Sequence, residues 1–306
     1  MEPEITVENP RVPSPHRDRR RDAILFRIAR LDKLISPAAL RLTELVADPH
    51  HEFQDVITTV RSDAGLTAAV LKAVNSVACG LTQKITSIER AVTYLGERFV
   101  VSAALKANEF ASPEVAVPGY DSVAGGLWDH NLRTAIASRE IALCHNRSAS
   151  ENLPADLVYI CGLLHDLGKF VLSGYMSQVE PALLESMTSL GGESVLGAEE
   201  NLLGINHVMA GNLLAKQWKL PAPIPSILKY HHRPHLAIDA WLPMTYAVHL
   251  GNQMSSLRCS DEDLQEMNRR AGYAYKRHLN LSGDAFEKIL FRTEQEYQRV
   301  VKAFAS

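Results

Sequence analysis

The chain has few cysteines, and none of them belongs to a CxxC pair. The four thiols are widely scattered, at Cys79, Cys144, Cys161 and Cys259. A disulfide framework and a thiolate metal knuckle both need cysteines at close and regular spacing, so this distribution argues against both.

Long apolar runs and a strong net charge are also missing. No run approaches the ~20 apolar residues that span a bilayer, and the N-terminus opens with acidic and proline-rich sequence in place of an apolar signal core. The net charge is −3, from 32 basic and 35 acidic side chains, which gives no global electrostatic case for nucleic acid or an anionic membrane. We therefore expect a cytoplasmic protein that does not bind a membrane, and the sequence carries no strong signal for a nucleic-acid partner.

Sustained strand alternation is absent as well, and short helical patterns divided by Pro and Gly fill the chain instead. With 306 residues, of which 46% are apolar and 22% charged, the chain is long enough for one large core or two smaller ones. The sequence predicts an all-α, multi-helix bundle.

Composition divides this bundle into four parts. Residues 1–22 carry prolines and a basic run from Arg17 to Arg21, and we expect a mobile tail there. A Pro- and Gly-rich stretch between Ala111 and Gly126 separates an N-terminal helical subdomain, 23–112, from a second helical subdomain, 113–260. Residues 261–306 form a C-terminal helical extension. Within the second subdomain we expect single helices over 199–218 and around the His165-Asp166 pair.

Histidine is the unusual part of the composition, with 12 residues. Five of them fall in apolar helical segments of the second subdomain, and a carboxylate follows one directly; the set is His130, His165, Asp166, His207, His231 and His232. A single such histidine is more often a core residue bonded to a carbonyl. Six candidate ligands together favour a metal site, in which Asp166 could bridge two ions.

Local spacing suggests further roles at this site. Lys169 lies three residues after Asp166, where its ammonium could either meet a phosphate oxygen or simply pair with the carboxylate. On a helix His231 and His232 diverge by about 100°, so we expect them to serve different metals or one of them to support the other. His249 is open to two interpretations, a substitute ligand or a structural residue.

Two segments of the N-terminal subdomain resemble the signature of a known family. The segments are 63–76, DAGLTAAVLKAVNS, and 85–96, ITSIERAVTYLG. They are similar to the HDOD family, a bacterial relative of the HD-domain phosphohydrolases, and the likeness covers roughly residues 25–255. We interpret Ser87 as an N-cap and Gly96 as a tight helix end, with the apolar residues between them as core. This resemblance implies an HD-like bundle with an N-terminal HDOD subdomain.

The resemblance also implies a ligand set. HD proteins have a first histidine, a His-Asp pair and a distant final aspartate, and their HD-GYP relatives add a lysine after the pair, another histidine and a double histidine. The matching residues here are His130, His165, Asp166, Lys169, His207, His231 and His232, and Asn252 takes the place of the final aspartate. An amide offers only a neutral oxygen, so Asn252 would be a weak ligand. The Gly-Tyr-Pro motif of cyclic-dinucleotide hydrolases is replaced by Arg-Pro-His at 233–235.

Two functions follow from this resemblance. The first is a bacterial signal-transduction module, regulatory in role, with an HD-type centre of one or two divalent transition ions (Fe, Mn or Zn) and a signalling protein or nucleotide as its partner. The alternative is a metal-dependent phosphohydrolase, a phosphodiesterase acting on a nucleotide or cyclic nucleotide, with Asp166 and Lys169 as catalytic residues. Asn252 and the missing Gly-Tyr-Pro favour the regulatory interpretation.

Overall fold

The computed structural model describes residues 15–30, 37–75, 81, 85–106, 120, 126–176, 193–220, 222–257, 261–271, 273–281 and 284–304. Every regular element within these ranges is a helix, which confirms the predicted all-α bundle. The predicted subdomain boundary at 112/113 lies outside the described residues, so the division into subdomains stays a prediction.

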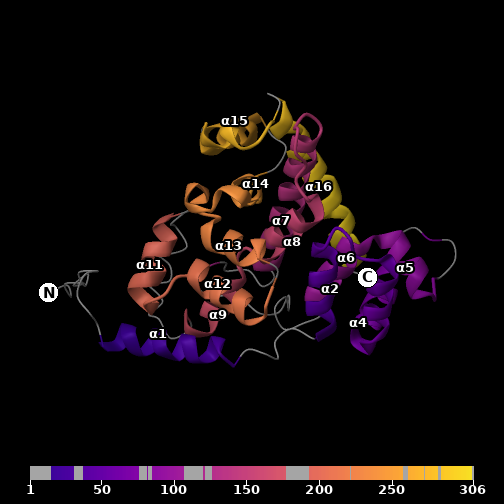
Figure 1. Ribbon diagram of the computed structural model, residues 1–306, viewed down its shortest axis with the longest axis horizontal. Coiled ribbons are helices and arrows are strands. Elements are labelled where there is room, and N and C mark those ends of the chain that lie inside the picture. The colour runs from indigo at the N-terminus through magenta and orange to yellow at the C-terminus, as the bar shows by residue number, and fades with distance from the viewer. Residues whose placement is uncertain are drawn as a thin grey trace.

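The N-terminal lobe, purple in Figure 1, consists of α2 (Pro37–Ala47), α3 (Phe53–Arg61), α4 (Ala64–Val74), α5 (Ile88–Leu95) and α6 (Glu97–Lys106). The hydroxyl of Ser87 accepts the N–H of Arg90 at 3.4 Å and so caps α5. Gly96 follows its last turn with φ 85°, a conformation that glycine adopts without strain. The cap and the helix end predicted from the sequence are both confirmed.

Asn75, in the first signature segment, has a structural role in this lobe. Asn75 stands at the end of α4, where its side-chain amide donates to the carbonyl of Ile85 at 2.7 Å and accepts the Ile85 N–H at 2.7 Å. These two bonds fix the chain entering α5 against the end of α4. The residue therefore contributes to packing, as the sequence predicts.

The second lobe contains the long helix α7 (Gly126–Asn146) and the shorter helices packed around it. These are α8 (Ala155–Leu164), α9 (Leu167–Met176), α11 (Glu193–Leu203), α12 (His207–Gln217), α13 (Pro223–Tyr230), η3 (Pro234–Leu236), η4 (Asp239–Trp241) and α14 (Leu242–Met254). Helix α8 contacts α7, α13 and α14 in this lobe and also α2 and α6 of the N-terminal lobe. It is the shared central element of the fold.

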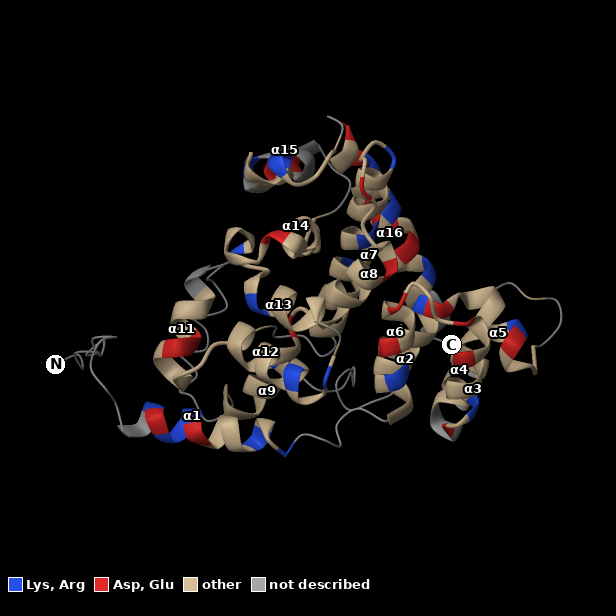
Figure 2. Ribbon diagram, viewed as in Figure 1, with Lys and Arg blue, Asp and Glu red and all other residues tan. Residues whose placement is uncertain are grey.

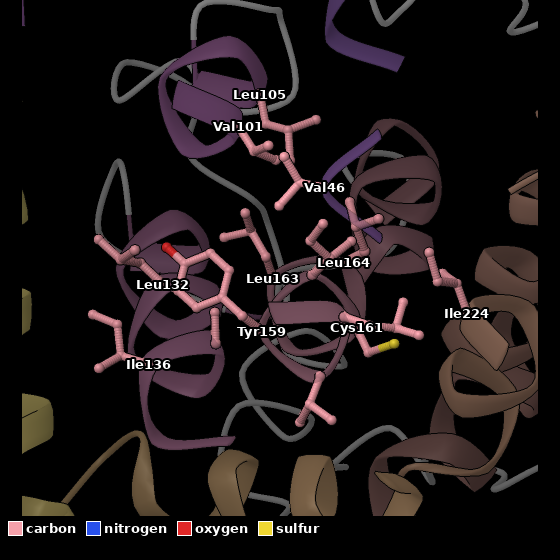
Figure 3. Packing of buried hydrophobic residues seen from close by; sticks show 14 of the residues in the cluster. Val46, Val101, Leu105, Leu132, Ile136, Tyr159, Cys161, Leu163, Leu164 and Ile224 are labelled. Atoms are coloured by element: carbon pink, nitrogen blue, oxygen red, sulfur yellow. The ribbon is translucent and has the colours of Figure 1, made fainter. Parts of the chain in front are cut away.

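One hydrophobic core runs through both lobes by way of α8. Figure 3 shows Val46 of α2 together with Val101 and Leu105 of α6 on the side of α8 that carries Leu163 and Leu164. A buried hydrogen bond of 2.7 Å between Ser102 of α6 and Tyr159 of α8 adds a polar link between the lobes. The end of α8 is thereby held on two sides.

The C-terminal extension contains α15 (Asp261–Ala271), η5 (Ala274–Arg277) and α16 (Ala285–Phe304). Helix α16, yellow in Figure 1, lies along α7 and reaches α4. The buried Arg133 of α7 anchors it, because its guanidinium lies 3.5 Å from the centre of the Tyr297 ring and 2.6 Å from Glu294. A shielded cation–π contact with an added ion pair is a strong local anchor.

The first helix, α1 (Pro15–Ile28), corrects the prediction of a tail over 1–22, since residues 15–22 are helical. It packs on α9, α11 and α12 through Ile24 and Ile28, which are both buried. Arg20 donates to the carbonyl of Leu202 at 3.1 Å, and Tyr175 donates to the carbonyl of Ala23 at 2.9 Å. Figure 2 shows basic and acidic residues interspersed along this helix. Two apolar residues one turn apart suffice to dock a segment that is otherwise polar.

Candidate metal centre

The His165-Asp166 pair lies in a turn between two helices and not inside one. Helix α8 ends at Leu164 and α9 begins at Leu167, and both side chains of the pair are fully buried. The N–H of Lys169 donates to the carbonyl of Asp166 at 2.8 Å and fixes this turn. The prediction of one continuous helix was wrong here. On such a helix adjacent side chains would diverge by about 100°, whereas the turn directs both toward one point.

Three ligand atoms form a nearly equilateral triangle at this point. The Nε2 atoms of His130 and His165 are 3.2 Å apart, and Oδ2 of Asp166 lies 3.3 Å from the first and 3.2 Å from the second. Ligands bound at about 2.1 Å from one ion lie roughly 3 Å apart when octahedral and somewhat farther when tetrahedral. We call this set the Oδ2 group; its two imidazoles and one carboxylate match a facial metal triad.

The other oxygen of Asp166 faces a second set of imidazoles, which we call the Oδ1 group. The Nε2 atoms of His207 and His231 lie 3.4 Å and 3.6 Å from Oδ1. The Nε2 of His232 lies 3.1 Å from that of His207, and all the ligand atoms of this group lie within 4.8 Å of one another. Since each oxygen of Asp166 serves its own group, the carboxylate is placed to bridge two ions.

The double histidine differs from the geometric expectation. Both rings belong to the Oδ1 group, with centroids 4.2 Å apart, so the first of the two expected arrangements, separate metals, is wrong, and a supporting role for one of the two rings stays a prediction. His231 follows the last residue of α13, and His232 lies in the turn beyond it. The helical 100° rule does not apply to a pair that straddles a helix end.

His207 also stands at a helix end, as the first residue of α12. The predicted single helix over 199–218 was wrong, because the chain breaks after α11 at Gly204, whose φ is 73°. Asn206 then caps α12 by accepting the N–H of Met209 at 3.0 Å. Gly168 lets α9 approach this end closely, since a Cβ at position 168 would overlap the carbonyl of His207. The break and the close approach bring His207 to Asp166.

Glu199 is a residue of the centre that sequence reasoning missed. Its carboxylate is fully buried, accepts the Nδ1–H of His207 at 2.8 Å and accepts the backbone N–H of the same residue at 2.7 Å. This carboxylate fixes the tautomer in which Nε2 keeps its lone pair and faces Asp166. From the sequence, a glutamate eight residues before a histidine can be recognised as its hydrogen-bond partner only if the helix break between them is predicted.

Two other imidazoles of the centre are oriented in the same way, by backbone carbonyls that accept from Nδ1. The Nδ1 of His165 donates to the carbonyl of Gly162 at 2.8 Å, and that of His231 donates to the carbonyl of Leu228 at 2.9 Å. Because a carbonyl only accepts, Nδ1 carries the proton in both rings and Nε2 is left as a lone-pair donor.

Burial keeps three imidazoles of the centre neutral, those of His130, His231 and His232. It holds the pKa of His231 well below 6.5, helped by the neighbouring His232 and His165 rings. Burial and the nearby His207 likewise hold the pKa of His232 well below 6.5. Burial also lowers the pKa of His130, although Asp166 opposes that shift. Neutral imidazoles at physiological pH are the form that binds a metal ion.

The carboxylate at the centre is ionised. Burial alone would raise the pKa of Asp166, but the adjacent His165 and the Lys169 ammonium outweigh it and keep this pKa well below 3.8. A fully buried carboxylate that stays charged requires cations beside it. The charged carboxylate and the single ammonium beside it leave room for more positive charge.

Unsatisfied buried atoms support this fit to a metal. Among the described residues, Oδ1 and Oδ2 of Asp166 and Nε2 of His231 are buried without a partner in hydrogen-bond geometry. The Lys169 ammonium lies 2.6 Å from Oδ2, so that oxygen has an ion-pair contact only. Orphaned lone pairs of this kind are costly unless something binds them. The donor set, five imidazoles and one carboxylate, suits a divalent transition ion.

Lys169 and Tyr120 stand at the edge of the Oδ2 group. The Lys169 ammonium lies 5.5 Å from the centre of the Tyr120 ring, and that ring meets His207 edge-on at 6.5 Å. Burial and the charge of Glu199 raise the pKa of Tyr120 well above its usual value, so the phenol stays protonated. The side chains of His130 and Lys169 are 28% and 17% exposed, so solvent reaches the centre at the Oδ2 group, and His232 is partly exposed as well.

Of the two interpretations of His249, the structure favours a structural role, in which it supports His231. Its Nδ1 donates to the backbone carbonyl of His231 at 2.7 Å, and its Nε2 accepts from Gln253 at 2.9 Å, so both ring nitrogens are engaged by protein. Asn252 is half-buried on the same helix, and its carbonyl accepts from Ser255, whose hydroxyl bonds to Nδ1 of His130 at 2.9 Å. The role of Asn252 as a weak ligand stays a prediction.

The most apolar stretch of the chain leads into and out of this centre. Among the described residues, 155–176 are by length and composition apolar enough to cross a membrane, which corrects the expectation that no run approaches that length, but 83% of the qualifying window is buried inside the fold. Its apolar character is accounted for by the core that α8 and α9 form. The cytoplasmic location stays a prediction.

An all-helical bundle that gathers a His-Asp pair and further histidines at its helix ends has the architecture of an HD-type protein. The family model of the HDOD domain matches residues 34–234. The chain therefore belongs to the HDOD family, as the signature segments predict.

Individual relatives are distant. An "Uncharacterized protein" of Treponema pallidum (strain Nichols) is 24% identical over 216 residues, which are 70% of this chain and 40% of that protein. The chain thus matches less than half the length of this curated relative.

Two crystal structures show the same fold. A "Putative signal transduction protein" of Marinobacter aquaeolei VT8 has a TM-score of 0.70 at 20% identity and covers 97% of this chain and 68% of its own. A "Putative phosphohydrolase" of Shewanella amazonensis SB2B has a TM-score of 0.66 at 19% identity and covers 92% of this chain and 98% of its own. At such identities the likeness is one of fold.

Proposed function

We propose that this protein is a regulatory module of bacterial signal transduction with an HD-type metal centre of one or two divalent transition ions (Fe, Mn or Zn). Its ligands are His130, His165, Asp166, His207, His231 and His232, with Asn252 as a weak ligand. The observation that carries this proposal is the position of Asp166, whose two oxygens face separate sets of imidazole nitrogens. The ions are held by six residues that this chain supplies itself.

A regulatory role is supported by where the centre lies in the fold. Helix α8 ends directly before His165, and its last residues, Leu163 and Leu164, pack against α2 and α6 of the N-terminal lobe. A change of metal state at His165 would therefore act on a helix that both lobes share. The partner that reads this change would be a signalling protein or a nucleotide ligand.

Hydrogen exchange tests this coupling. Exchange in α2 and α6 should slow when chelator-treated protein is reloaded with Mn²⁺, and His165→Ala should abolish the difference. His235→Ala is the matched control, because His235 is exposed and outside both ligand groups. Metal that binds but leaves α2 and α6 unchanged would count against the regulatory proposal.

A phosphohydrolase is the second candidate, favoured by the solvent side of the centre. The Oδ2 group has the half-exposed His130 and the Lys169 ammonium at its rim. Bound divalent ions would supply Lewis-acid activation of water and of a phosphoryl oxygen. Lys169 would hold a phosphate oxygen at the same rim. The name of the Shewanella relative agrees with this candidate, though the fold alone does not fix an activity.

Turnover decides between the two candidates. Metal-loaded protein should be assayed with a generic nitrophenyl phosphodiester and with a cyclic dinucleotide, beside Asp166→Ala. The regulatory proposal expects no hydrolysis above that of the variant. Hydrolysis by the wild type that Asp166→Ala abolishes would establish the phosphohydrolase instead.

A further inference from the structure

The two ligand groups around Asp166 are unequal in composition. The Oδ1 group offers three imidazoles to one ion, whereas the Oδ2 group offers only His130 and His165. Both contain Asp166, so the number of neutral ligands distinguishes them. By ligand count alone, the Oδ1 group should bind an ion more tightly.

The two groups also differ in the groups that hold their imidazoles from behind. Burial does not separate them, because each has one partly exposed ring, His232 in the Oδ1 group and His130 in the Oδ2 group. In the Oδ1 group the buried carboxylate of Glu199 accepts the Nδ1–H of His207. A carboxylate behind the ring fixes the imidazole and makes it a better ligand for a metal ion.

Charge separates the groups further. The Lys169 ammonium lies 2.6 Å from Oδ2, the same oxygen that completes the triangle with His130 and His165. An ion in the Oδ2 group would therefore sit beside a fixed positive charge. Among the described residues, Asp166 is the only carboxylate in either group, because Glu199 is engaged by His207. Two divalent ions would share one negative charge, and the ion nearer the ammonium is the less stable of the two.

We propose that the centre holds a resident ion in the Oδ1 group and an exchangeable ion in the Oδ2 group, for which the Lys169 ammonium competes at Oδ2. This rests on the proposed metal centre and assigns its two positions different roles. The resident ion is a structural part of the module. The exchangeable position responds to the concentration of a divalent transition ion such as Mn²⁺, and this response is the signal that the module reads.

The test is a titration of untagged, chelator-treated full-length protein with Mn²⁺. Equilibrium dialysis gives the affinities, and electron paramagnetic resonance distinguishes an isolated ion from a coupled pair. Wild type should bind one ion tightly and a second ion at least about tenfold more weakly, as expected for a site next to a fixed unit charge. The coupled spectrum should appear only with the second ion.

Variants assign the two positions. His130→Ala should lose the weak ion and keep the tight one, whereas His232→Ala should lose the tight ion. The assignment does not depend on whether His232→Ala folds, since His130→Ala must by itself remove only the weaker ion. Loss of the tight ion in a folded His130→Ala protein, shown by an unchanged circular dichroism spectrum, would overturn the proposal.

Substitutions that remove or keep the positive charge at position 169 test the role of Lys169. Lys169→Met removes the ammonium at similar size and should tighten the second ion about tenfold. Lys169→Arg keeps the charge, so the second ion should still bind weakly. Lys288→Met is the control, because Lys288 pairs with Asp284 away from the centre. Equal affinity in Lys169→Met and wild type would overturn the competition at Oδ2.

The titration also separates this inference from the proposed function. Wild type that binds two ions with equal affinity would overturn the inference and leave the metal centre standing. Wild type that binds no Mn²⁺, Zn²⁺ or Fe²⁺ would overturn the metal centre itself.

Discussion

Both oxygens of Glu199 lie 2.8 Å from Nδ1 of His207, and one of them also accepts the backbone N–H of that residue at 2.7 Å. The contact joins the end of α11 to the start of α12 across the turn that interrupts them. It converts a histidine at a helix end into an oriented ligand, with its free nitrogen toward Asp166.

Removing this support should weaken metal binding. We expect Glu199→Ala to lower metal affinity by roughly 10–100-fold, the usual effect of losing a group that orients a ligand. Glu199→Gln should recover part of the loss, since its amide oxygen can accept the Nδ1–H. The matched control is Glu200→Gln, because Glu200 is exposed on the same helix. Unchanged Mn²⁺ affinity in Glu199→Ala would show that His207 is held by other means.

Gly168 should tolerate no side chain. A Cβ there would overlap the His207 carbonyl, so Gly168→Ala should destabilise the fold by about 1–3 kcal/mol and weaken metal binding. Gly197→Ala is the control, because no atom lies within 4 Å of its Cβ position and a helical Ala should gain roughly 0.5–1 kcal/mol. Urea unfolding measures both. Equal stability of the two variants would contradict the close packing of α9 on α12.

The metal-free protein should begin to lose stability at only mildly acidic pH. The pKa values of His130, His231 and His232 are lowered in the folded state from 6.5, so below this pH the unfolded chain binds more protons than the folded one. Their stabilising contribution is complete above 6.5 and is lost as pH falls toward the lowered values. The urea midpoint should therefore drop between about pH 7.5 and pH 5.5.

Matched variants identify the groups responsible for this drop. His232→Gln should make it shallower, and His235→Ala, at an exposed position, should not. A urea midpoint that stays constant over this pH range in the wild type would mean that the rings are not held neutral.

A restored carboxylate at position 252 tests the family pattern. Asn252→Asp should raise metal occupancy, because it adds a negative ligand on the side of His130, in the Oδ2 group, which offers fewer imidazoles than the Oδ1 group. Asn201→Asp, at an exposed position on α11, controls for added charge alone. Metal content and affinity that both match the wild type would show that position 252 is not the counterpart of the final HD aspartate.

Local rules predicted the N-terminal lobe well. The cap at Ser87, the helix end at Gly96 and the buried face between them depend on residues within one helix, and the structure confirms each. The signature segments therefore identified the family by residues whose role is packing. The ligand types could also be chosen from the sequence, because several buried imidazoles together need a common partner.

The geometry of the centre could not be predicted in the same way. The breaks at His165-Asp166 and at Gly204 depend on how α9 and α12 pack, which no local pattern records. Glu199 becomes part of the centre only through the second break. The docking of α1 rests on Ile24 and Ile28 meeting a distant surface, so its polar composition suggested a tail.

Elemental analysis of untagged protein, purified without added metal, tests the central claim most directly. The wild type should contain Fe, Mn or Zn at close to one ion per chain or more, and Asp166→Ala should lose it because both ligand groups share that carboxylate. A wild-type protein free of these metals, which also fails to take them up when they are supplied, would contradict the account.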